Sequence, residues 1–464
     1  MLIMWIAEAL TLTMLATPAP SAHSAQTEAA PPADSTPPNI VLIIADDLGY
    51  GELGCYRAAG REGIATPHLD ALAASGVRFT DGYVSCPVCA PTRAGILTGR
   101  YQQRIGFELN PGSARDASMF GLPRSSPTLA ERLSMAGYDT AMVGKWHLGD
   151  REGMRPTERG FGEFFGFLGG SHAYLDAKKG AITLTRGTAP IEEREYLTDA
   201  FAREACSFIT RAHERPYFLY LSFNAVHAPM ETDSARLMAA TKEVQGAKRR
   251  QTFAAMLRGL DDAVGRVLAA VNASSAAANT LVFFISDNGG PTRSTSSRND
   301  PLRGVKAQLW EGGIRVPFMM RWSRGGVPAG MTCAQPVISL DITATALRAA
   351  GVVSSEMEGV DLVALARDGC AAPAHEGLFW RYGDQWAVRM GDWKLVVARA
   401  DRTADAEAPS VQGRSPQLYN LRDDIAESKD LSGEMPERVA KMRAAFDAWN
   451  AANIPAKWGG AAAK

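Results

Sequence analysis

The sequence has little cysteine, almost no net charge and few long apolar runs. Only six of its 464 residues are cysteine, too few for a small fold held together by disulfides. The 49 Lys and Arg residues nearly balance 50 Asp and Glu, which gives a net charge of −1. This balance argues against a nucleic-acid partner, because such proteins carry a basic excess. With 46% hydrophobic and 21% charged residues, the composition is that of a globular protein and excludes a disordered or fibrous chain.

The amino-terminal residues differ from the rest of the chain. Residues 1–17 are mostly apolar and are followed by a stretch rich in Ala, Ser and Pro. We predict a secretory signal peptide over residues 1–25 and a linker over residues 26–38. A membrane anchor is disfavoured because Glu8 would be costly in lipid, and no later segment is apolar over a bilayer's thickness. We therefore expect a periplasmic or secreted protein without stable membrane association.

From residue 39 onward, short apolar runs alternate with helical segments. The runs at residues 39–45, 140–143, 218–223 and 281–286 are continuously apolar, as is typical of parallel strands buried on both faces. Intervening segments carry helix caps; for example, Ser126 and Pro127 are expected to begin a helix that Gly137 ends. The pattern predicts an α/β fold, with a large, mostly parallel mixed sheet sandwiched by helices.

The expected secondary structure changes near residue 365, from alternating strands and helices to short strands. Residues 377–380, 386–389 and 393–398 resemble short strands joined by Gly-containing turns, and residues 436–452 form an amphipathic helical pattern. We expect a small C-terminal antiparallel sheet with one helix. The predicted organisation is a main domain over residues 39–365 and a smaller subdomain over residues 366–464.

Asp, Asn, Lys or His residues follow each of the four apolar runs. In an open α/β sheet, ligands bind beyond the carboxyl ends of the strands. Asp-Asn-Gly alone is a common turn sequence, but four polar strand ends at one edge are not explained by turns. The residues in question are Asp46 and Asp47, Lys145 and His147, His227, and Asp287 and Asn288.

The side-chain types of these strand-end residues indicate a site for a divalent cation and an anionic group. Carboxylate and amide oxygens favour Ca²⁺ or Mg²⁺ over zinc, which prefers His and Cys ligands. Lys145, Lys306 and Arg93 would bring positive charge to the same centre, which implies an anionic substrate group. For Lys306 alone, a surface ion pair is the competing interpretation, although its Gly-rich and non-helical setting favours a role in the site.

Cys86 and Cys89 have the spacing C-x-x-C, which alone would fit a redox pair or half of a zinc site. No second C-x-x-C and no thioredoxin-like context accompany it. Residues 89–93, CAPTR, followed by AGILTGR, resemble instead the C-x-P-[ST]-R signature of the type I sulfatases of the alkaline phosphatase superfamily. Pro91 suits the first turn of a helix, so Cys89 would lie at a helix N-terminus, where backbone N–H groups favour anions.

The resemblance extends from about Asn39 to Leu431. It includes GKWHLG around Lys145 and His147, NAVHAP around His227, LRGVKAQLWEGGIRVP around Lys306, and LYNLRDDIAESKDL at residues 418–431. It implies a catalytic domain over residues 39–365 and conversion of Cys89 to formylglycine by a formylglycine-generating enzyme. It also implies one Ca²⁺ per chain, held by Asp46, Asp47, Asp287, Asn288 and the modified Cys89.

The same resemblance implies roles for the remaining residues. Lys145 and Lys306 would bind the sulfate oxygens, and Arg93 would orient the formylglycine hydrate that attacks sulfur. His227 would protonate the leaving oxygen, and His147 would then take a proton from the remaining hydroxyl. Such an enzyme would act on a sulfated small molecule or glycan, and the chain looks similar to arylsulfatases and N-acetylgalactosamine-sulfate sulfatases.

Two other functions share this scaffold. A phosphonate or phosphate ester hydrolase of the same superfamily would use similar residues, whereas a lectin-like glycan binder should lack some catalytic residues, and none is missing. The aromatic, Gly-rich segment at residues 161–174 could contact a sugar through Ser171, His172 and Tyr174, or could simply pack. His68 and His375 are interpreted as structural or surface residues.

Overall fold

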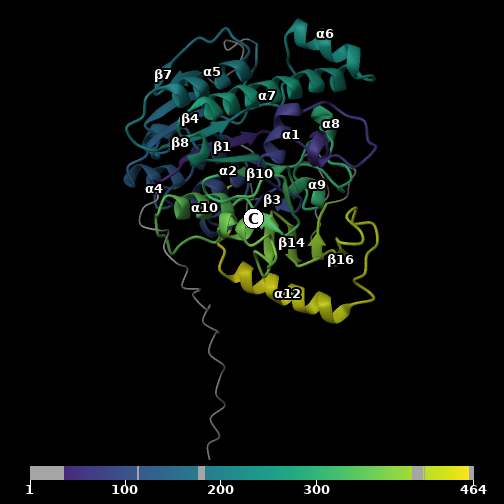
Figure 1. Ribbon diagram of the computed structural model, residues 1–464. Coiled ribbons are helices and arrows are strands. Elements are labelled where there is room, and N and C mark those ends of the chain that lie inside the picture. Colours follow the sequence, from purple (N-terminus) through teal and green to yellow (C-terminus); the bar gives the residue numbers. More distant parts are fainter. Residues whose placement is uncertain (1–35, 112–113, 176–182, 400–410, 412, 459–464) are drawn as a thin grey trace, which may run out of the picture. The chain divides into compact units, whose positions relative to one another are not determined.

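A ten-stranded mixed sheet lies at the centre of the fold (Figure 1). The structure is a computed structural model that describes residues 36–111, 114–175, 183–399, 411 and 413–458. The predicted signal peptide and nearly all of the predicted linker fall outside these residues. The strands are β1 (Asn39–Ala45), β2 (Val77–Phe79), β4 (Asp139–Lys145), β5 (Glu163–Phe167), β6 (Leu184–Arg186), β7 (Ala189–Pro190), β8 (Tyr217–Ser222), β9 (Thr280–Ser286), β10 (Phe318–Arg321) and β11 (Met331–Cys333). Their order is β11-β2-β10-β9-β1-β8-β4-β5-β6-β7.

The four apolar runs of the sequence form β1, β4, β8 and β9, and these strands are neighbours in the sheet. They pair in parallel, with Ile44 opposite both Ser222 of β8 and Ile285 of β9. Antiparallel pairs occur only toward the edges, at β9-β10, β10-β2, β5-β6 and β6-β7. The predicted parallel centre of a mixed sheet is therefore confirmed, and the carboxyl ends of the four strands meet at one edge.

Helices cover both faces of the sheet (Figure 1). The helices of the described residues are α1 (Pro67–Ala74), α2 (Cys89–Thr98), α3 (Ala114–Met119), α4 (Leu129–Met135), α5 (Leu197–Thr210), α6 (Ser234–Glu243), α7 (Lys248–Ala273), α8 (Thr292–Thr295), α9 (Glu311–Ile314), α10 (Asp341–Ala349) and α11 (Leu362–Arg367), whereas α12 (Pro436–Ala451) packs on a second, smaller sheet. Alternate residues of β1 serve two hydrophobic cores. Leu42 packs in the core shared with α2, α4 and α10, whereas Val41 and Ile43 pack in the core shared with α1, α5 and α7.

The helix expected to begin at Ser126 and Pro127 begins two residues later. In α4 the N-cap is Thr128, whose side chain accepts a hydrogen bond from the Glu131 backbone N–H while Glu131 accepts one from the Thr128 N–H. This reciprocal capping box satisfies two N–H groups at once. Ser126 offers no such partner three residues on, which explains the shift.

A four-stranded antiparallel sheet and one helix form the C-terminal part, as predicted. Its strands are β13 (Leu378–Tyr382), β14 (Gln385–Met390), β15 (Trp393–Val397) and β16 (Gln417–Asn420), in that order, and α12 packs on β14 and β15. The fourth strand, β16, was not expected from the sequence. The boundary expected near residue 365 falls inside α11, and the division into two domains stays a prediction.

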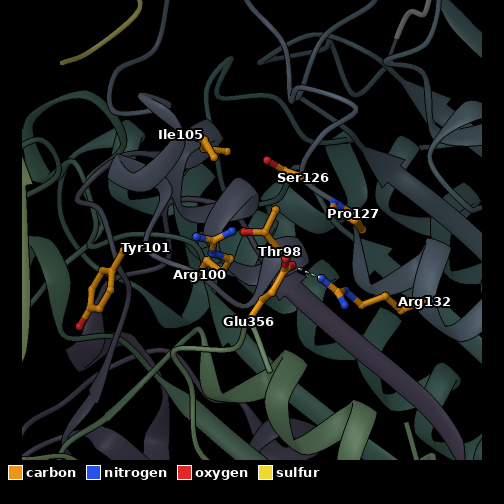
Figure 2. A pocket seen from close by; sticks show the side chains of 8 residues that line it. All are labelled: Thr98, Arg100, Tyr101, Ile105, Ser126, Pro127, Arg132 and Glu356. Carbon is orange, nitrogen blue, oxygen red and sulfur yellow. Dashed lines mark hydrogen bonds and ion pairs between the residues drawn. The ribbon is translucent and has the colours of Figure 1, made fainter. Parts of the chain in front are cut away.

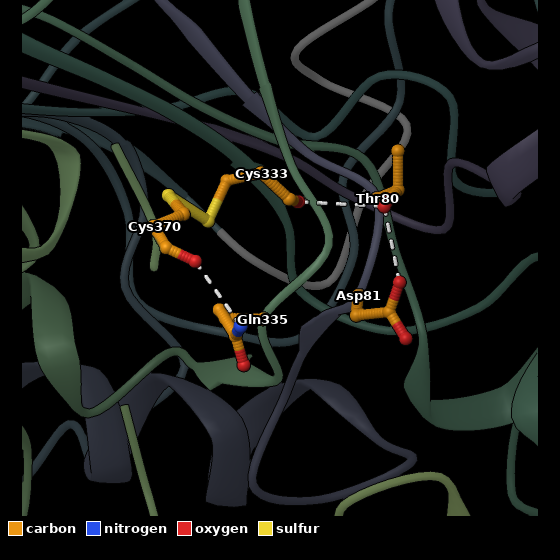
Figure 3. Close-up of a disulfide and its surroundings, with 5 residues drawn as sticks. All are labelled: Thr80, Asp81, Cys333, Gln335 and Cys370. Carbon is orange, nitrogen blue, oxygen red and sulfur yellow. Dashed lines mark hydrogen bonds between the residues drawn. A yellow bond between two sulfur atoms is a disulfide. The ribbon is translucent and has the colours of Figure 1, made fainter. Parts of the chain in front are cut away.

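One disulfide joins Cys333, at the end of β11, to Cys370, just after α11 (Figure 3). Cys55, Cys86, Cys89 and Cys206 are free thiols, so the C-x-x-C pair is not the pair that is joined. Among the residues that the structure describes, no helix has both the length and the apolar character needed to cross a bilayer.

Candidate active site at the carboxyl edge of the sheet

Cys89 is the first residue of α2 and is almost fully buried, with 2% of its surface exposed. Asn110 lies beside it: the Asn110 Nδ2 donates to Cys89 Sγ at 3.5 Å, and its Oδ1 accepts the Ala90 N–H at 3.3 Å. Lys145 and Lys306 outweigh the effect of burial and lower the pKa of the Cys89 thiol. The predicted position of Cys89 at a helix N-terminus is therefore confirmed, in an electropositive setting that suits an anion.

The opposite end of α2 holds only a small pocket, lined by Thr98, Arg100, Tyr101 and Ser126 among others (Figure 2). Its volume is about 10 Å³, which is room for about one water molecule. A pocket of this size cannot hold a sugar, so it is not a candidate for the substrate site.

Arg93, one helical turn after Cys89, connects three strand ends. Its Nε and Nη2 donate to Asp287 Oδ2 at 3.1 and 2.8 Å, and its Nη1 donates to the Lys145 carbonyl at 3.2 Å and to Ser222 Oγ. Burial alone would raise the pKa of Asp287, but Arg93 outweighs it and holds that pKa below its usual range. Arg93 thereby keeps Asp287 ionised without contact with water.

Asp46 and Asp47 follow β1 and each carboxylate binds one lysine. Lys145 Nζ lies 2.6 Å from Asp46 Oδ2, and Lys306 Nζ lies 2.6 Å from Asp47 Oδ1. Burial and the nearby Asp287 raise the pKa of Asp46 well above its usual range despite Lys145. The pKa of Asp47 is lowered, because Lys306 and His227 outweigh burial. The surroundings therefore favour the neutral form of Asp46 and the ionised form of Asp47.

The donor set fits a hard divalent cation. The ligand atoms of Asp46, Asp47 and His227 all lie within 4.8 Å of one another, and Asn288 Nδ2 donates to Asp47 Oδ1 at 2.7 Å. Asp46 Oδ1 and Asn288 Oδ1 are buried oxygens with no hydrogen-bond partner among the described residues. Buried oxygens of this kind normally have a partner, and a Ca²⁺ or Mg²⁺ ion would provide one for both.

Two histidines complete the cluster. The pKa of His147 is lowered well below its usual range by burial and by Lys145 and Arg93. Burial, assisted by Lys145 and Lys306, lowers the pKa of His227 to about 4 although Asp47 opposes the shift. The His227 Nδ1 lies 2.5 Å from the Ala228 carbonyl, and a carbonyl only accepts. That nitrogen therefore carries a proton, and Nε2 faces Asp47 at 3.6 Å.

Lys306 reaches the site from a loop that the C-terminal sheet supports. The next residue, Ala307, has a φ of 67°, a left-handed conformation that is unfavourable for a residue with a Cβ. Its N–H donates to the Pro87 carbonyl at 2.9 Å, and its carbonyl accepts from Gln385 Nε2 at 3.0 Å. Gln385 is fully buried on β14. The loop is thus held between the segment that precedes Cys89 and the small sheet.

Hydrogen bonds, ion pairs and electrostatic interactions connect all the site residues that the sequence predicted. These are Asp46, Asp47, Cys89, Arg93, Lys145, His147, His227, Asp287, Asn288 and Lys306. Asn110, Ser222 and Gln385 also belong to the site and were not predicted from the sequence. Ser222 is the last residue of β8, so a search that included the final strand residue would have found it. Asn110 and Gln385 had no comparable signal.

The aromatic segment over residues 161–174 supports the site more than it faces a substrate. Tyr174 is buried, and its hydroxyl donates to the carbonyls of Asn224 and His227 at 2.6 and 2.8 Å. His172 is also buried and packs on Phe167, whereas Ser171 is exposed. Packing is therefore the better interpretation for Tyr174, which holds the loop that carries His227.

Comparisons with known proteins agree with this geometry. The sulfatase family model matches residues 38–352. The chain is 35% identical over 384 residues to N-acetylgalactosamine-6-sulfatase of Rattus norvegicus, covering 77% of this chain and 71% of the relative. It is 34% identical over 473 residues to arylsulfatase A of Bos taurus, covering 90% and 89%. The solved structure of Ps i-CgsB in complex with k-i-k-neocarrahexaose superposes with a TM-score of 0.81 at 31% identity, covering 91% of this chain and 95% of that one. The chain therefore belongs to the sulfatase family of sulfuric ester hydrolases.

Proposed function

We propose that this protein hydrolyses a sulfate ester of a sulfated carbohydrate to an alcohol and inorganic sulfate. The observation that carries the proposal is the position of Cys89, buried at the N-terminus of α2 beside Asn110, where the charges of Lys145 and Lys306 lower the pKa of its thiol. Relatives named for N-acetylgalactosamine 6-sulfate, and a solved neighbour holding a carrageenan-type hexasaccharide, favour a carbohydrate substrate. The relatives are sulfatases, so a phosphonate or phosphate ester hydrolase is not favoured.

The proposed nucleophile comes from Cys89. Its conversion by a formylglycine-generating enzyme would supply a hydrated aldehyde whose hydroxyl attacks sulfur. One Ca²⁺ per chain, held by Asp46, Asp47, Asp287, Asn288 and the modified residue 89, would polarise the sulfate oxygens as a Lewis acid.

The remaining residues bind the substrate and move protons. Lys145 and Lys306 bind sulfate oxygens, and Arg93 keeps Asp287 ionised beside the nucleophile. A bound anionic ester raises the pKa of His227, which favours the protonated Nε2 that donates to the leaving oxygen. His147, kept neutral by its lowered pKa, can then accept the proton of the remaining hydroxyl at residue 89, so that the carbon–oxygen bond to sulfate breaks, inorganic sulfate leaves and the aldehyde re-forms.

Substitution of Cys89 tests the proposal directly. Protein produced together with a formylglycine-generating enzyme should hydrolyse an aryl sulfate and a sulfated saccharide faster than the matching phosphate ester. Cys89→Ala should abolish turnover, whereas Cys86→Ala, a matched change at a buried thiol three residues away, should keep it. Peptide mass analysis must show modification at Cys89 alone. Sulfatase turnover by Cys89→Ala would overturn the mechanism.

Removal of the metal tests the ligand set with a readout other than activity. Dialysis against a chelator should lower the unfolding temperature, and added Ca²⁺ should restore it. At a free concentration of 100 times Kd, binding stabilises the native state by about 2.7 kcal/mol. Asp47→Asn should lose this Ca²⁺ response, and an unchanged response in that variant would remove Asp47 from the ligand set.

We also propose that the protein is periplasmic or secreted, with a signal peptide over residues 1–25. The Cys333–Cys370 disulfide supports this proposal, because stable disulfides belong mostly to oxidising compartments. Amino-terminal sequencing of the exported protein would test it. An amino terminus that retains residues 1–25 would contradict signal cleavage.

A further inference from the structure

A second, arginine-lined cavity of about 250 Å³ lies between the loop after β1 and the loop that precedes Lys306. Four arginines and two acidic residues line it: Arg57, Arg61, Arg250, Arg298, Glu62 and Asp300. None of these residues belongs to the cluster around Cys89, and no part of the proposed mechanism uses them.

The cavity lies at the same edge of the sheet as the candidate active site. Gly51 lines it and is four residues beyond Asp47, so the two Cα atoms are separated by at most about 14 Å. The two loops are joined directly, because the Gly51 N–H donates to the Arg298 carbonyl at 3.2 Å. Arg250 lies in the first turn of α7, whose other end leads into the start of β9. That first turn is therefore at the end of the sheet where Asp287 follows β9.

Some arginines of the cavity form an ion pair with a carboxylate and others do not. Arg250 forms a buried pair with Glu52, at 2.6 and 2.8 Å. Arg57 donates instead to the backbone carbonyls of Glu52 and Ile64, which carry no formal charge. The exposed side chains of Arg61 and Arg298 have no ion-pair partner within 4 Å in the part of the chain that the structure describes.

The acidic residues offset most of this positive charge but leave an excess of one guanidinium group. Glu62 and Asp300 line the cavity. Glu52 accepts hydrogen bonds from the Arg250 guanidinium and from the Arg298 N–H, so four guanidinium groups are set against three carboxylates. Guanidinium groups bind sulfate-like and carboxylate groups through paired N–H donors. The cavity therefore combines volume, partly unpaired arginines and proximity to the reaction centre.

We propose that this cavity is a second anion subsite, which binds a sulfate or carboxylate group on a neighbouring sugar while the reactive ester lies at Cys89. The inference rests on the proposed sulfatase function and narrows its substrate to an oligosaccharide with more than one anionic group. The near-zero net charge of the chain hides such a site, because its arginines are balanced by acidic residues elsewhere.

The test compares two substrates in the same variants. For Arg61→Gln and Arg298→Gln, kcat/KM is measured on a chondroitin 6-sulfate hexasaccharide and on an aryl sulfate that has a single anionic group. The ratio of the two values should fall roughly tenfold in each variant, as expected for the loss of one charged hydrogen bond. Arg293→Gln is the matched control, since Arg293 is exposed on α8 but does not line the cavity, and should leave the ratio unchanged.

A binding measurement separates failure of the subsite from failure of the proposed function. Calorimetry with protein in which Cys89 is unconverted should show tighter binding of the hexasaccharide than of N-acetylgalactosamine 6-sulfate, and Arg298→Gln should remove most of the difference. Equal affinities for the two ligands, or a preference that survives Arg298→Gln, would overturn the subsite. An enzyme without sulfatase turnover that retained this Arg-dependent preference would instead overturn the function and leave the subsite in place.

Discussion

The candidate active site has two halves that are built in different ways. One half consists of residues that leave the parallel strands β1, β4, β8 and β9, such as Asp46, Lys145 and Asp287. The other half is the Lys306 loop, which no strand of the large sheet carries and which the C-terminal sheet holds through Gln385. A strand end thus positions its polar residue by sheet register, whereas a loop residue needs support from a distant segment.

The hydrogen bonds that hold the two halves in place differ in strength as well as in origin. In the strand-end half, Arg93 binds Asp287, Ser222 and the Lys145 carbonyl without exposure to water. In the loop half, one hydrogen bond to the Pro87 carbonyl and one from the Gln385 side chain hold Ala307 in a left-handed conformation, which is unfavourable for a non-glycine residue by about 1 kcal/mol or more. We expect the first half to govern folding and turnover together, and the second to govern turnover more selectively.

The largest effect is expected for Arg93→Ala. The variant leaves Asp287 as a buried charge without its partner, which should lower the free energy of unfolding by roughly 3–5 kcal/mol and abolish turnover. Arg93→Lys keeps the charge but not the paired geometry, so it should recover part of the stability and little of the activity. Urea unfolding and kcat on an aryl sulfate measure both quantities. Normal stability in Arg93→Ala would contradict the role given to this residue.

An intermediate effect is expected for Gln385→Ala. The change removes the bond that holds the Ala307 carbonyl, so Lys306 loses its fixed position, and kcat/KM should fall roughly tenfold, equivalent to about 1.4 kcal/mol. Gln103→Ala is the matched control, because buried Gln103 also donates to a carbonyl of the C-terminal sheet, that of Arg381 at 2.8 Å, but does not contact the Lys306 loop. Gln385 Oε1 also accepts hydrogen bonds from the Leu309 and Arg399 N–H groups, so Gln385→Ala should lose more stability than Gln103→Ala, and only Gln385→Ala should lose activity. Equal kcat/KM in the two variants would show that the sheet does not position Lys306.

The smallest effect on turnover is expected at His375, outside both halves. Its Nε2 lies 3.0 and 3.1 Å from the two oxygens of buried Asp341. Burial would lower the pKa of His375, but Asp341 outweighs burial and raises it. The pair therefore adds stability fully below the unfolded pKa of about 6.5, and this contribution is lost as pH rises through the higher folded value. Urea unfolding between pH 5.5 and 8.5 should show this loss in the wild type and not in His375→Gln, with the same pH profile of kcat in both.

The central strands and the polar residues at their ends could be predicted from the sequence, because both follow from local patterns. Continuous apolar runs identified the four central strands, and the rule that ligands bind at strand ends identified Asp46, Lys145 and Asp287. The supporting residues could not be found in this way. Gln385 contacts Ala307 although the two residues are 78 positions apart in the sequence, and no periodicity in either segment encodes that contact. Tyr174 was ambiguous for the same reason, since its partners are carbonyl groups of a loop far along the chain.

The disulfide limits how the two predicted domains can be separated. Cys333 and Cys370 close a loop that contains α10 and α11, and therefore the expected boundary near residue 365. A protease that cut the chain once anywhere inside this loop would leave two fragments that still migrate together until a reducing agent is added. Separate expression of residues 39–365 and 366–464 would also divide the two cysteines between different polypeptides.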